Sequence, residues 1–178
     1  MLTKTDFIIL PISYLDEQYA RYVNDEIQLK ASDNGFHQYF DDDDNWLGYL
    51  GESVVTRWLQ SLGINFEHTV CIGRPDNCDF KIAGKCIDLK TSPLISNRLG
   101  VVWQPYVFVN ANQIAHTNVD AYWFAKVDIR NKLLYLIGQE TAAKIRKSKI
   151  CNAYKHPCIR KLYKHLHPIL TDGEVKLP

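Results

Sequence analysis

A chain of 178 residues, 46% of them hydrophobic and 23% charged, can bury the core of one domain without disulfide bonds, so its composition excludes a disordered or fibrous protein. No run reaches the roughly 18 apolar residues of a membrane span, and residues 1–6 lack the basic flank of a secretion signal, so we expect a cytoplasmic protein with no membrane partner. The net charge of +1 hides an asymmetry, because residues 1–45 are mainly acidic and residues 143–167 are basic without an acidic side chain, which favours a polyanionic partner.

Residues 1–44 predict an acidic, helical N-terminal segment. Behind a short apolar stretch at residues 7–10, the spacing of apolar residues predicts a helix at about residues 16–31, which a turn signal at residues 33–35 ends. The acidic run at residues 41–44 then either caps the next helix as a solvated loop or forms a metal-binding patch. The apolar positions of the predicted helix are Tyr19, Tyr22, Val23, Ile27 and Leu29.

The clearest helical pattern covers about residues 45–62, and Gly63 follows it as a stop signal. Glu52 is unusual in this helix. It lies three residues before Val55 and seven before Leu59, which places its carboxylate at the edge of the face that should be buried. Because an unpaired buried charge is costly, Glu52 requires a partner.

Segments of strand-like composition follow the helix. Those at residues 65–72, 79–82 and 86–91 predict a meander whose last two strands form a hairpin. Further strands are predicted at residues 101–109, 121–127 and 133–137. A short helix is predicted within residues 141–150, at the start of a basic C-terminal arm that contains several aromatic residues and prolines.

The predicted hairpin can close in two registers. A two-residue turn at Ala83-Gly84 places Asp79 opposite Asp88, whereas a turn at Gly84-Lys85 places Asp79 opposite Lys90. In both registers Asp79, Asp88 and Lys90 share one face. The apolar residues of the two strands point to the other face, into the core; they are Phe80, Ile82, Ile87 and Leu89.

Two carboxylates directly opposite each other are unfavourable unless a cation lies between them. Carboxylate oxygens are ligands that Mg²⁺ prefers, and Lys90 can reach a water or phosphate held by such a metal. The alternative is a solvated sheet face with alternating charges. We favour the metal site because an acid on a helix, an acid that opens a strand and an Asp-x-Lys motif on its partner strand occur in that order within about 40 residues.

These residues resemble the motifs of the PD-(D/E)xK nuclease superfamily, which has the restriction-endonuclease-like fold. The matching segments are Gly51-Glu52, Asp79-Phe80 and residues 87–92, and the resemblance covers residues 45–92. It implies an αβββαβ core in which a central mixed sheet is flanked by helices.

The resemblance also implies roles for individual residues. Asp79, Asp88 and the Leu89 carbonyl would bind Mg²⁺, for which Mn²⁺ would substitute. Lys90 would orient the attacking water or stabilise the transition-state phosphate. Glu52 would complete the metal shell or hold Lys90.

Two details depart from the family pattern. The literal Pro-Asp dipeptide is Pro75-Asp76, three residues early, and strand parity would put Asp76 on the wrong face, so the role is assigned to Asp79. The third motif has Asp88 where many members have Glu, which shortens the reach to the metal by one methylene. Gln113 is either an accessory active-site residue or an ordinary solvated loop residue.

The C-terminal arm carries the residues that we expect to bind DNA. Basic and aromatic side chains alternate there, as on many nucleic-acid-binding surfaces, although the sequence does not separate contacts to bases from contacts to phosphates. The candidates are Lys144, Arg146, Lys147, Lys149, Tyr154, Lys155, Arg160, Lys161 and Lys164.

The five cysteines indicate neither a disulfide framework nor a zinc module, because their number is odd and none forms a Cys-x-x-Cys pair. We interpret them as small buried residues. The alternative is a zinc-stabilised binding module on Cys151, His156 and Cys158, which lacks an evident fourth ligand.

The sequence therefore predicts one α/β domain at residues 1–178, with an N-terminal segment (1–44), a catalytic core (45–140) and a C-terminal arm (141–178). The resemblance implies a Mg²⁺-dependent DNA endonuclease, a hydrolase of the homing, mobile-element or restriction type. Cutting both strands requires two active sites, so we expect a homodimer or a higher homo-oligomer. The alternatives are a Holliday-junction-type resolvase and a non-catalytic nucleic-acid-binding protein on a nuclease fold.

Overall fold

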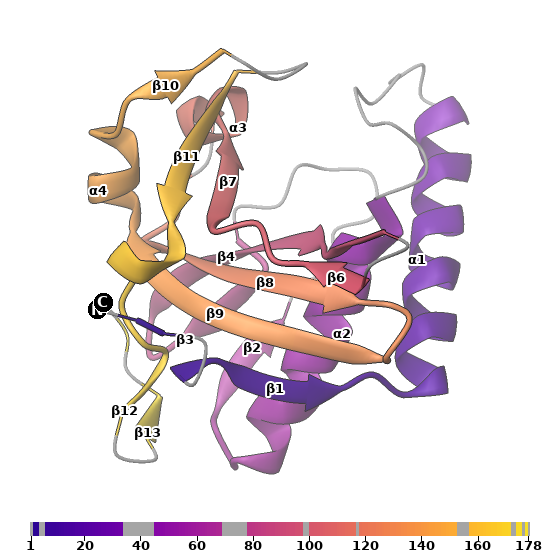
Figure 1. Ribbon diagram of the computed structural model, residues 1–178. Coiled ribbons are helices and arrows are strands. Elements are labelled where there is room, and N and C mark those ends of the chain that lie inside the picture. Colours follow the sequence, from indigo (N-terminus) through magenta and orange to yellow (C-terminus); the bar gives the residue numbers. More distant parts are fainter. Residues whose placement is uncertain are drawn as a thin grey trace.

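The computed structural model describes residues 2–3, 6–33, 45–68, 78–97, 100–116, 118–152, 157–171, 174–175 and 177. The protein has a mixed α/β fold, with a curled six-stranded sheet in the order β1-β9-β8-β4-β3-β2 (Figure 1). In this sheet β4 and β8 run parallel, and the other neighbouring strands run antiparallel. The strands are β1 (Ile8–Pro11), β2 (Phe66–His68), β3 (Phe80–Ile82), β4 (Lys85–Pro93), β8 (Ala121–Asp128) and β9 (Leu133–Thr141).

One face of the sheet packs against α2 (Asn45–Ser61), which confirms the helix predicted at residues 45–62. The residues of α2 that recur at helical spacing, among them Leu50, Val54 and Leu59, are fully buried in this first core. From the sheet, the core receives the apolar hairpin residues that were predicted to face it: Phe80, Ile82, Ile87 and Leu89.

Helix α1 (Tyr14–Asp33) lies beside α2 and extends slightly beyond the predicted residues 16–31 at both ends (Figure 1). Only one side of it is covered. Val23 and Ile27 are buried there, whereas Tyr22 and Leu29, which belong to the same apolar pattern, are largely exposed. The acidic run at residues 41–44 lies outside the described residues.

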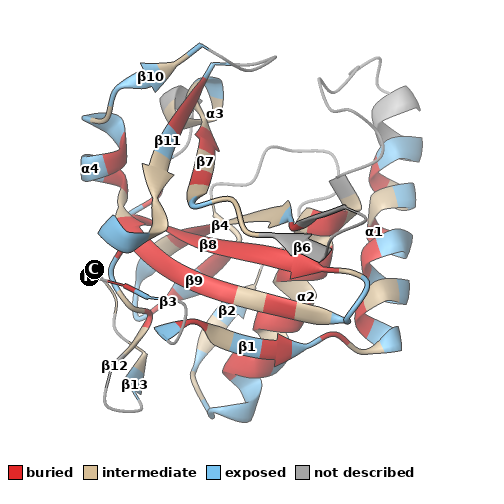
Figure 2. Ribbon diagram, viewed as in Figure 1, coloured by how far each residue is buried: buried red, intermediate tan, exposed pale blue. Residues whose placement is uncertain are grey.

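A second core covers the other face of the sheet. It joins Tyr122 and Phe124 of β8 to a small upright sheet in the order β10-β11-β7 and to α4 (Ala142–Arg146). The small sheet consists of β7 (Tyr106–Asn110), β10 (Ile150–Cys151) and β11 (Cys158–Leu162). Because β8 lies between the two cores, it is buried along its whole length, as Figure 2 shows.

Several predicted boundaries differ from the structure. The strand predicted at residues 101–109 is wrong as a single element: β6 (Gly100–Val102) pairs with β5 (Ile95–Asn97), and β7 begins after Pro105, which cannot donate a ladder hydrogen bond. The helix predicted at residues 141–150 is only α4, which the Thr141 side chain caps by accepting a hydrogen bond from the Lys144 amide. The remaining short elements are α3 (Ala111–His116), a 3₁₀ helix η2 (Tyr163–His165), β12 (Leu170–Thr171) and β13 (Glu174–Val175).

Part of the predicted C-terminal arm belongs to the fold, because β11 pairs along its whole length with β7. Among the described residues, no helix has both the length and the apolar character needed to cross a membrane.

Candidate active site

The β3–β4 hairpin has the first of the two predicted registers. Phe80 pairs with Ile87 and Ile82 pairs with Lys85, so the turn is Ala83-Gly84 and the alternative turn at Gly84-Lys85 is wrong. Both turn residues have positive φ, 48° at Ala83 and 78° at Gly84, as a type I′ hairpin turn requires. The paired register ends at Phe80, and the Asp79 amide still donates to the Ile87 carbonyl, so the ladder is irregular beside Asp88.

The carboxylate of Asp79 takes the place of a main-chain partner. The Asp79 amide donates to the Ile87 carbonyl at 3.0 Å, although β3 begins only at Phe80. The next amide along the same edge of β4 is that of Leu89. It donates to the Asp79 side chain, at Oδ2, at 2.6 Å. The N–H and C=O of one strand residue point to the same edge, so the Leu89 carbonyl also points toward Asp79. The structure therefore brings this carbonyl and the Asp79 carboxylate to one edge of β4.

Asp88 and Lys90 form an ion pair on the next part of β4. Lys90 Nζ donates to Asp88 Oδ1 at 2.6 Å, and the side chains are 23% and 8% exposed respectively. Burial alone would lower the pKa of Lys90, but the neighbouring carboxylates of Asp88 and Asp79 outweigh it and raise that pKa above its ordinary value. Lys90 is thus held as a cation between the two acids.

Glu52 has a partner, as its position on α2 requires. His68 at the end of β2 lies with Nε2 3.1 Å from Glu52 Oε2, and its Nδ1 is 3.4 Å from the Thr56 hydroxyl. The His68 ring stacks on Phe80, with 5.1 Å between the ring centroids. Sequence reasoning missed His68, and the only signal for it was the need of Glu52 for a partner.

A close approach of α2 to β4 brings Glu52 to this edge of the sheet. A Cβ atom on Gly51 would lie 2.1 Å from Thr91 Oγ1, so only glycine fits there. The Thr91 hydroxyl, which lies against α2 at Gly51, is buried and has no hydrogen-bond partner among the described residues, an exception to the usual pairing of buried polar groups.

The pKa of Asp79 reflects its proximity to Glu52, Asp88 and Lys90. Its pKa is raised well above the ordinary value, first by burial and then by the negative charges of Glu52 and Asp88, while Lys90 and the Leu89 amide act in the opposite direction. Tyr19 of α1 also lies near the site, because burial and the charge of Glu52 raise its pKa. Residues from α2 and β4 thus meet around Asp79, and Tyr19 of α1 lies near Glu52.

Two of the acidic side chains of the site bind neighbouring basic side chains. Asp88 binds Lys90 and Glu52 binds His68, and no cluster of three or more His, Cys, Asp or Glu side chains within the described ranges is arranged as a metal site. Gln113 lies half-buried in α3, and no described contact links it to Asp79. Asp76 lies outside the described residues.

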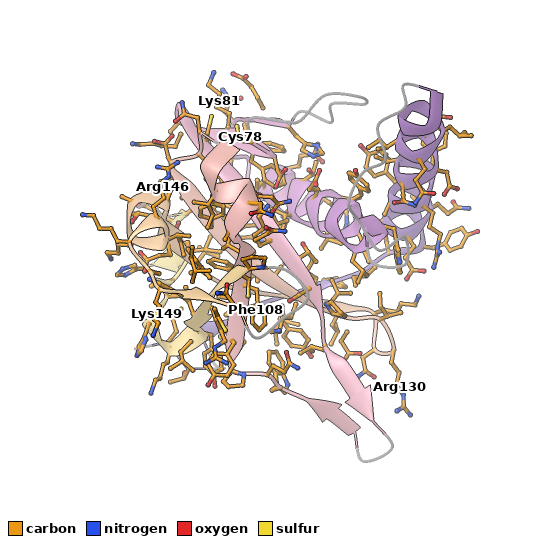
Figure 3. All side chains as sticks on the ribbon, turned by 90° about the horizontal axis from the view of Figure 1, so that it is seen from above. Cys78, Lys81, Phe108, Arg130, Arg146 and Lys149 are labelled. Carbon is orange, nitrogen blue, oxygen red and sulfur yellow. The ribbon has the colours of Figure 1, made fainter. Side chains whose placement is uncertain are left out.

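The residues expected to bind DNA do not form one uniform surface. Lys144 and Lys161 make ion pairs with the buried Glu140, at 3.3 and 2.8 Å. Tyr154 and Lys155 lie outside the described residues. The exposed candidates are Arg146 and Lys149, which project from the edge of the molecule in Figure 3, together with Lys147, Arg160 and Lys164.

The alternative zinc ligands are only partly described. Cys151 and Cys158 face each other in the β10–β11 pairing, and the Cys158 thiol donates to the Cys151 carbonyl at 3.8 Å. His156 lies outside the described residues.

In comparisons with known proteins, no family model, curated protein or solved structure matches this chain.

Proposed function

We propose that the protein is a Mg²⁺-dependent nuclease that hydrolyses phosphodiester bonds of DNA, with a restriction-endonuclease-like core formed by α2, β2, β3, β4 and β8. The observation that carries this proposal is the convergence of Glu52, Asp88 and Lys90 around Asp79, at the open end of the β3–β4 hairpin.

The cost of gathering these charges supports the proposal. Burial, followed by the negative charges of Glu52 and Asp88, raises the pKa of Asp79, and the single positive charge of Lys90 offsets these effects only in part. The donors are hard oxygen atoms, which suit Mg²⁺, and Mn²⁺ accepts similar ligands. The residues present therefore fit a divalent cation.

The roles follow from the positions of the groups. Asp79, Asp88 and the Leu89 carbonyl would hold the ion, and Glu52, kept in place by His68, would complete its shell. When bound, the ion supplies Lewis acidity and lowers the pKa of a coordinated water. Lys90 remains an ammonium next to Asp88, so it donates hydrogen bonds to the attacked phosphate or to the water.

DNA is the proposed substrate because the exposed basic residues of α4, β11 and η2 can neutralise phosphates. Endonucleolytic cleavage of both strands, as in restriction or homing enzymes, would require two copies of the chain, so the proposal includes a homodimer.

The test is incubation of supercoiled plasmid and of branched DNA with Mg²⁺, with Mn²⁺ and with EDTA. We expect cleavage with either metal and none with EDTA. Asp88→Asn and Lys90→Ala should each reduce the rate at least about 100-fold, the effect of removing one charge-stabilising group from an active site.

Lys85→Ala is the matched control for Lys90→Ala. Lys85 lies on the same strand, is 49% exposed, and makes only a surface ion pair with Asp120 at 3.8 Å, so its loss should leave the rate within about twofold. Cleavage that persists in EDTA, or that survives Asp88→Asn, would contradict the proposal.

A further inference from the structure

The two faces of the small sheet have different surroundings. Val107 and Val109 of β7 and Ile159 of β11 are buried in the second core, together with Ala142 and Ile145 of α4. The even-numbered residues point to the opposite face. Cys158 is buried there, and the others are half-buried or exposed: Tyr106, Phe108, Asn110, Arg160 and Leu162.

The even-numbered face presents a flat group of aromatic and guanidinium side chains. Arg160 pairs with Phe108 across the two strands, and its guanidinium carbon lies 4.3 Å from the centre of the Tyr106 ring. This cation–π contact holds a planar, exposed guanidinium against one ring and beside a second. Tyr106, Phe108 and Arg160 therefore form a contiguous surface, which we call the aromatic platform.

The small sheet that carries the aromatic platform lies on the same side of the main sheet as Asp88 and Lys90, opposite to α2. Asp88 and Lys90 are in register with Tyr122 and Phe124 of β8, and these two residues belong to the core that also receives Val107 and Val109. Figure 1 shows β7 and β11 rising from this side of the sheet. In Figure 3, Phe108 lies toward the middle of the molecule, while Arg146 and Lys149 lie at its edge.

Planar side chains of this kind suit an unpaired nucleobase. A base in a duplex offers its edges to a protein but hides its faces, whereas a base in a single strand can stack on aromatic rings and on arginine. The exposed guanidinium of Arg160 also offers a positive charge to the phosphates on either side of such a base.

We infer that the aromatic platform binds a single-stranded segment of DNA by stacking an unpaired base against Phe108 and the Tyr106–Arg160 pair. This inference rests on the proposed function for its choice of DNA, and it deepens that function. The enzyme would select DNA with an unpaired segment, such as a branch, flap or gap, over an uninterrupted duplex.

The experiment measures binding without cleavage. Fluorescence anisotropy in EDTA compares a labelled single strand with a strand of the same length that carries abasic sites, so both have the same phosphates. The wild type should bind the base-bearing strand more tightly. Phe108→Leu and Arg160→Lys should each weaken that binding about 5- to 100-fold, the range for loss of stacking on one base, and leave binding of the abasic strand unchanged.

Lys164→Ala provides the matched control. Lys164 is exposed on η2, so its loss should weaken binding of both strands equally and reduce the salt slope by about 0.7. The thermal unfolding midpoint of each variant should match that of the wild type, which separates a binding defect from a folding defect.

Three outcomes would overturn the inference. The first is equal affinity of the wild type for the base-bearing and the abasic strand. The second is an equal loss of affinity for both strands in Phe108→Leu. The third is conversion of a dimer to monomers by Phe108→Leu, which would make the platform a contact between two copies of the chain. Metal-dependent cleavage of plasmid does not depend on these results, so the nuclease proposal can stand or fail separately.

Discussion

At the scale of a single residue, Asp79 is the group whose charge conflicts most with its surroundings. Burial and the charges of Glu52 and Asp88 raise its pKa in the folded protein. A carboxyl whose pKa is higher in the folded than in the unfolded state binds protons more tightly when folded. The metal-free protein should therefore lose stability as the pH rises from the ordinary carboxyl pKa through the raised value for Asp79.

Asp79→Asn should stabilise the metal-free protein at pH 7. The amide oxygen can still accept the hydrogen bond of the Leu89 amide, while the repulsion from Glu52 and Asp88 disappears. A gain on the order of 1 kcal/mol is expected for relief of a like-charge cross-strand contact, or about 2–4 °C in Tm. Thermal unfolding in EDTA at pH 5 and pH 7.5 measures it, and the gain should be larger at pH 7.5.

The proposed metal site predicts that added Mg²⁺ reverses the order of stability of the two proteins. Mg²⁺ should raise the Tm of the wild type and leave that of Asp79→Asn unchanged, because only the wild type keeps the full set of proposed ligands. Asp120→Asn, which changes a carboxylate that is 45% exposed, is the control. A variant that is less stable than the wild type by the same amount at both pH values would show that Asp79 has only a structural role.

At the scale of an element, α2 contains two glycines in opposite situations. Gly48 has open space around the position of a Cβ atom, whereas a Cβ atom on Gly51 would clash with Thr91 Oγ1. The same substitution should therefore have opposite effects three residues apart in one helix. The contact at Gly51 is also what brings Glu52 to the sheet.

Gly48→Ala should stabilise the protein by about 0.5–1 kcal/mol, because alanine restricts the unfolded chain more than glycine does. Gly51→Ala should destabilise it by about 1–3 kcal/mol through overpacking, and should lower the proposed nuclease activity by moving Glu52 away from Asp79. Urea unfolding of both variants checks the signs.

Thr91→Ala should partly rescue Gly51→Ala, since it removes the hydroxyl oxygen that lies 2.1 Å from the added methyl group. The two substitutions together should therefore destabilise the protein by less than the sum of their separate effects. Purely additive effects of the two substitutions would mean that this helix–strand contact does not determine how close α2 lies.

At the scale of the whole molecule, Glu140 joins the small sheet to the main sheet, because it lies on β9 and binds Lys161 on β11. It is 2% exposed at the end of β9, and it accepts hydrogen bonds from Lys161 on β11 and from the Thr141 amide. Burial opposes its ionisation, but these bonds and Lys144 lower its pKa below the ordinary value. Its contribution to stability is therefore present above the ordinary carboxyl pKa and lost as the pH falls through the lowered one.

Glu140→Gln should destabilise the protein by about 1.5–3 kcal/mol at pH 7, the range for charged hydrogen bonds, and by less at pH 3.5. Denaturant unfolding at the two pH values measures the difference. Glu67→Gln is the control, because the Glu67–Lys81 pair is on the surface and should contribute less than about 1 kcal/mol. Equal losses at both pH values would contradict an electrostatic role for Glu140.

The sequence by itself determined the local features of the fold and of the site. The helix at residues 45–62, the parity that puts Phe80 and Ile87 in the core, and the requirement of Glu52 for a partner were all predicted, and the structure confirms them. These features depend on helical and strand periodicity, which neighbouring residues define.

Only the tertiary structure decided which distant residues meet. It selected one of the two hairpin registers, brought His68 to Glu52 and Lys161 to Glu140, and built the aromatic platform from β7 and β11. The most distant of these contacts joins Tyr106 and Leu162, which are 56 positions apart in the chain. No local periodicity specifies them, because they arise when separate elements bury their apolar faces against the two sides of one sheet.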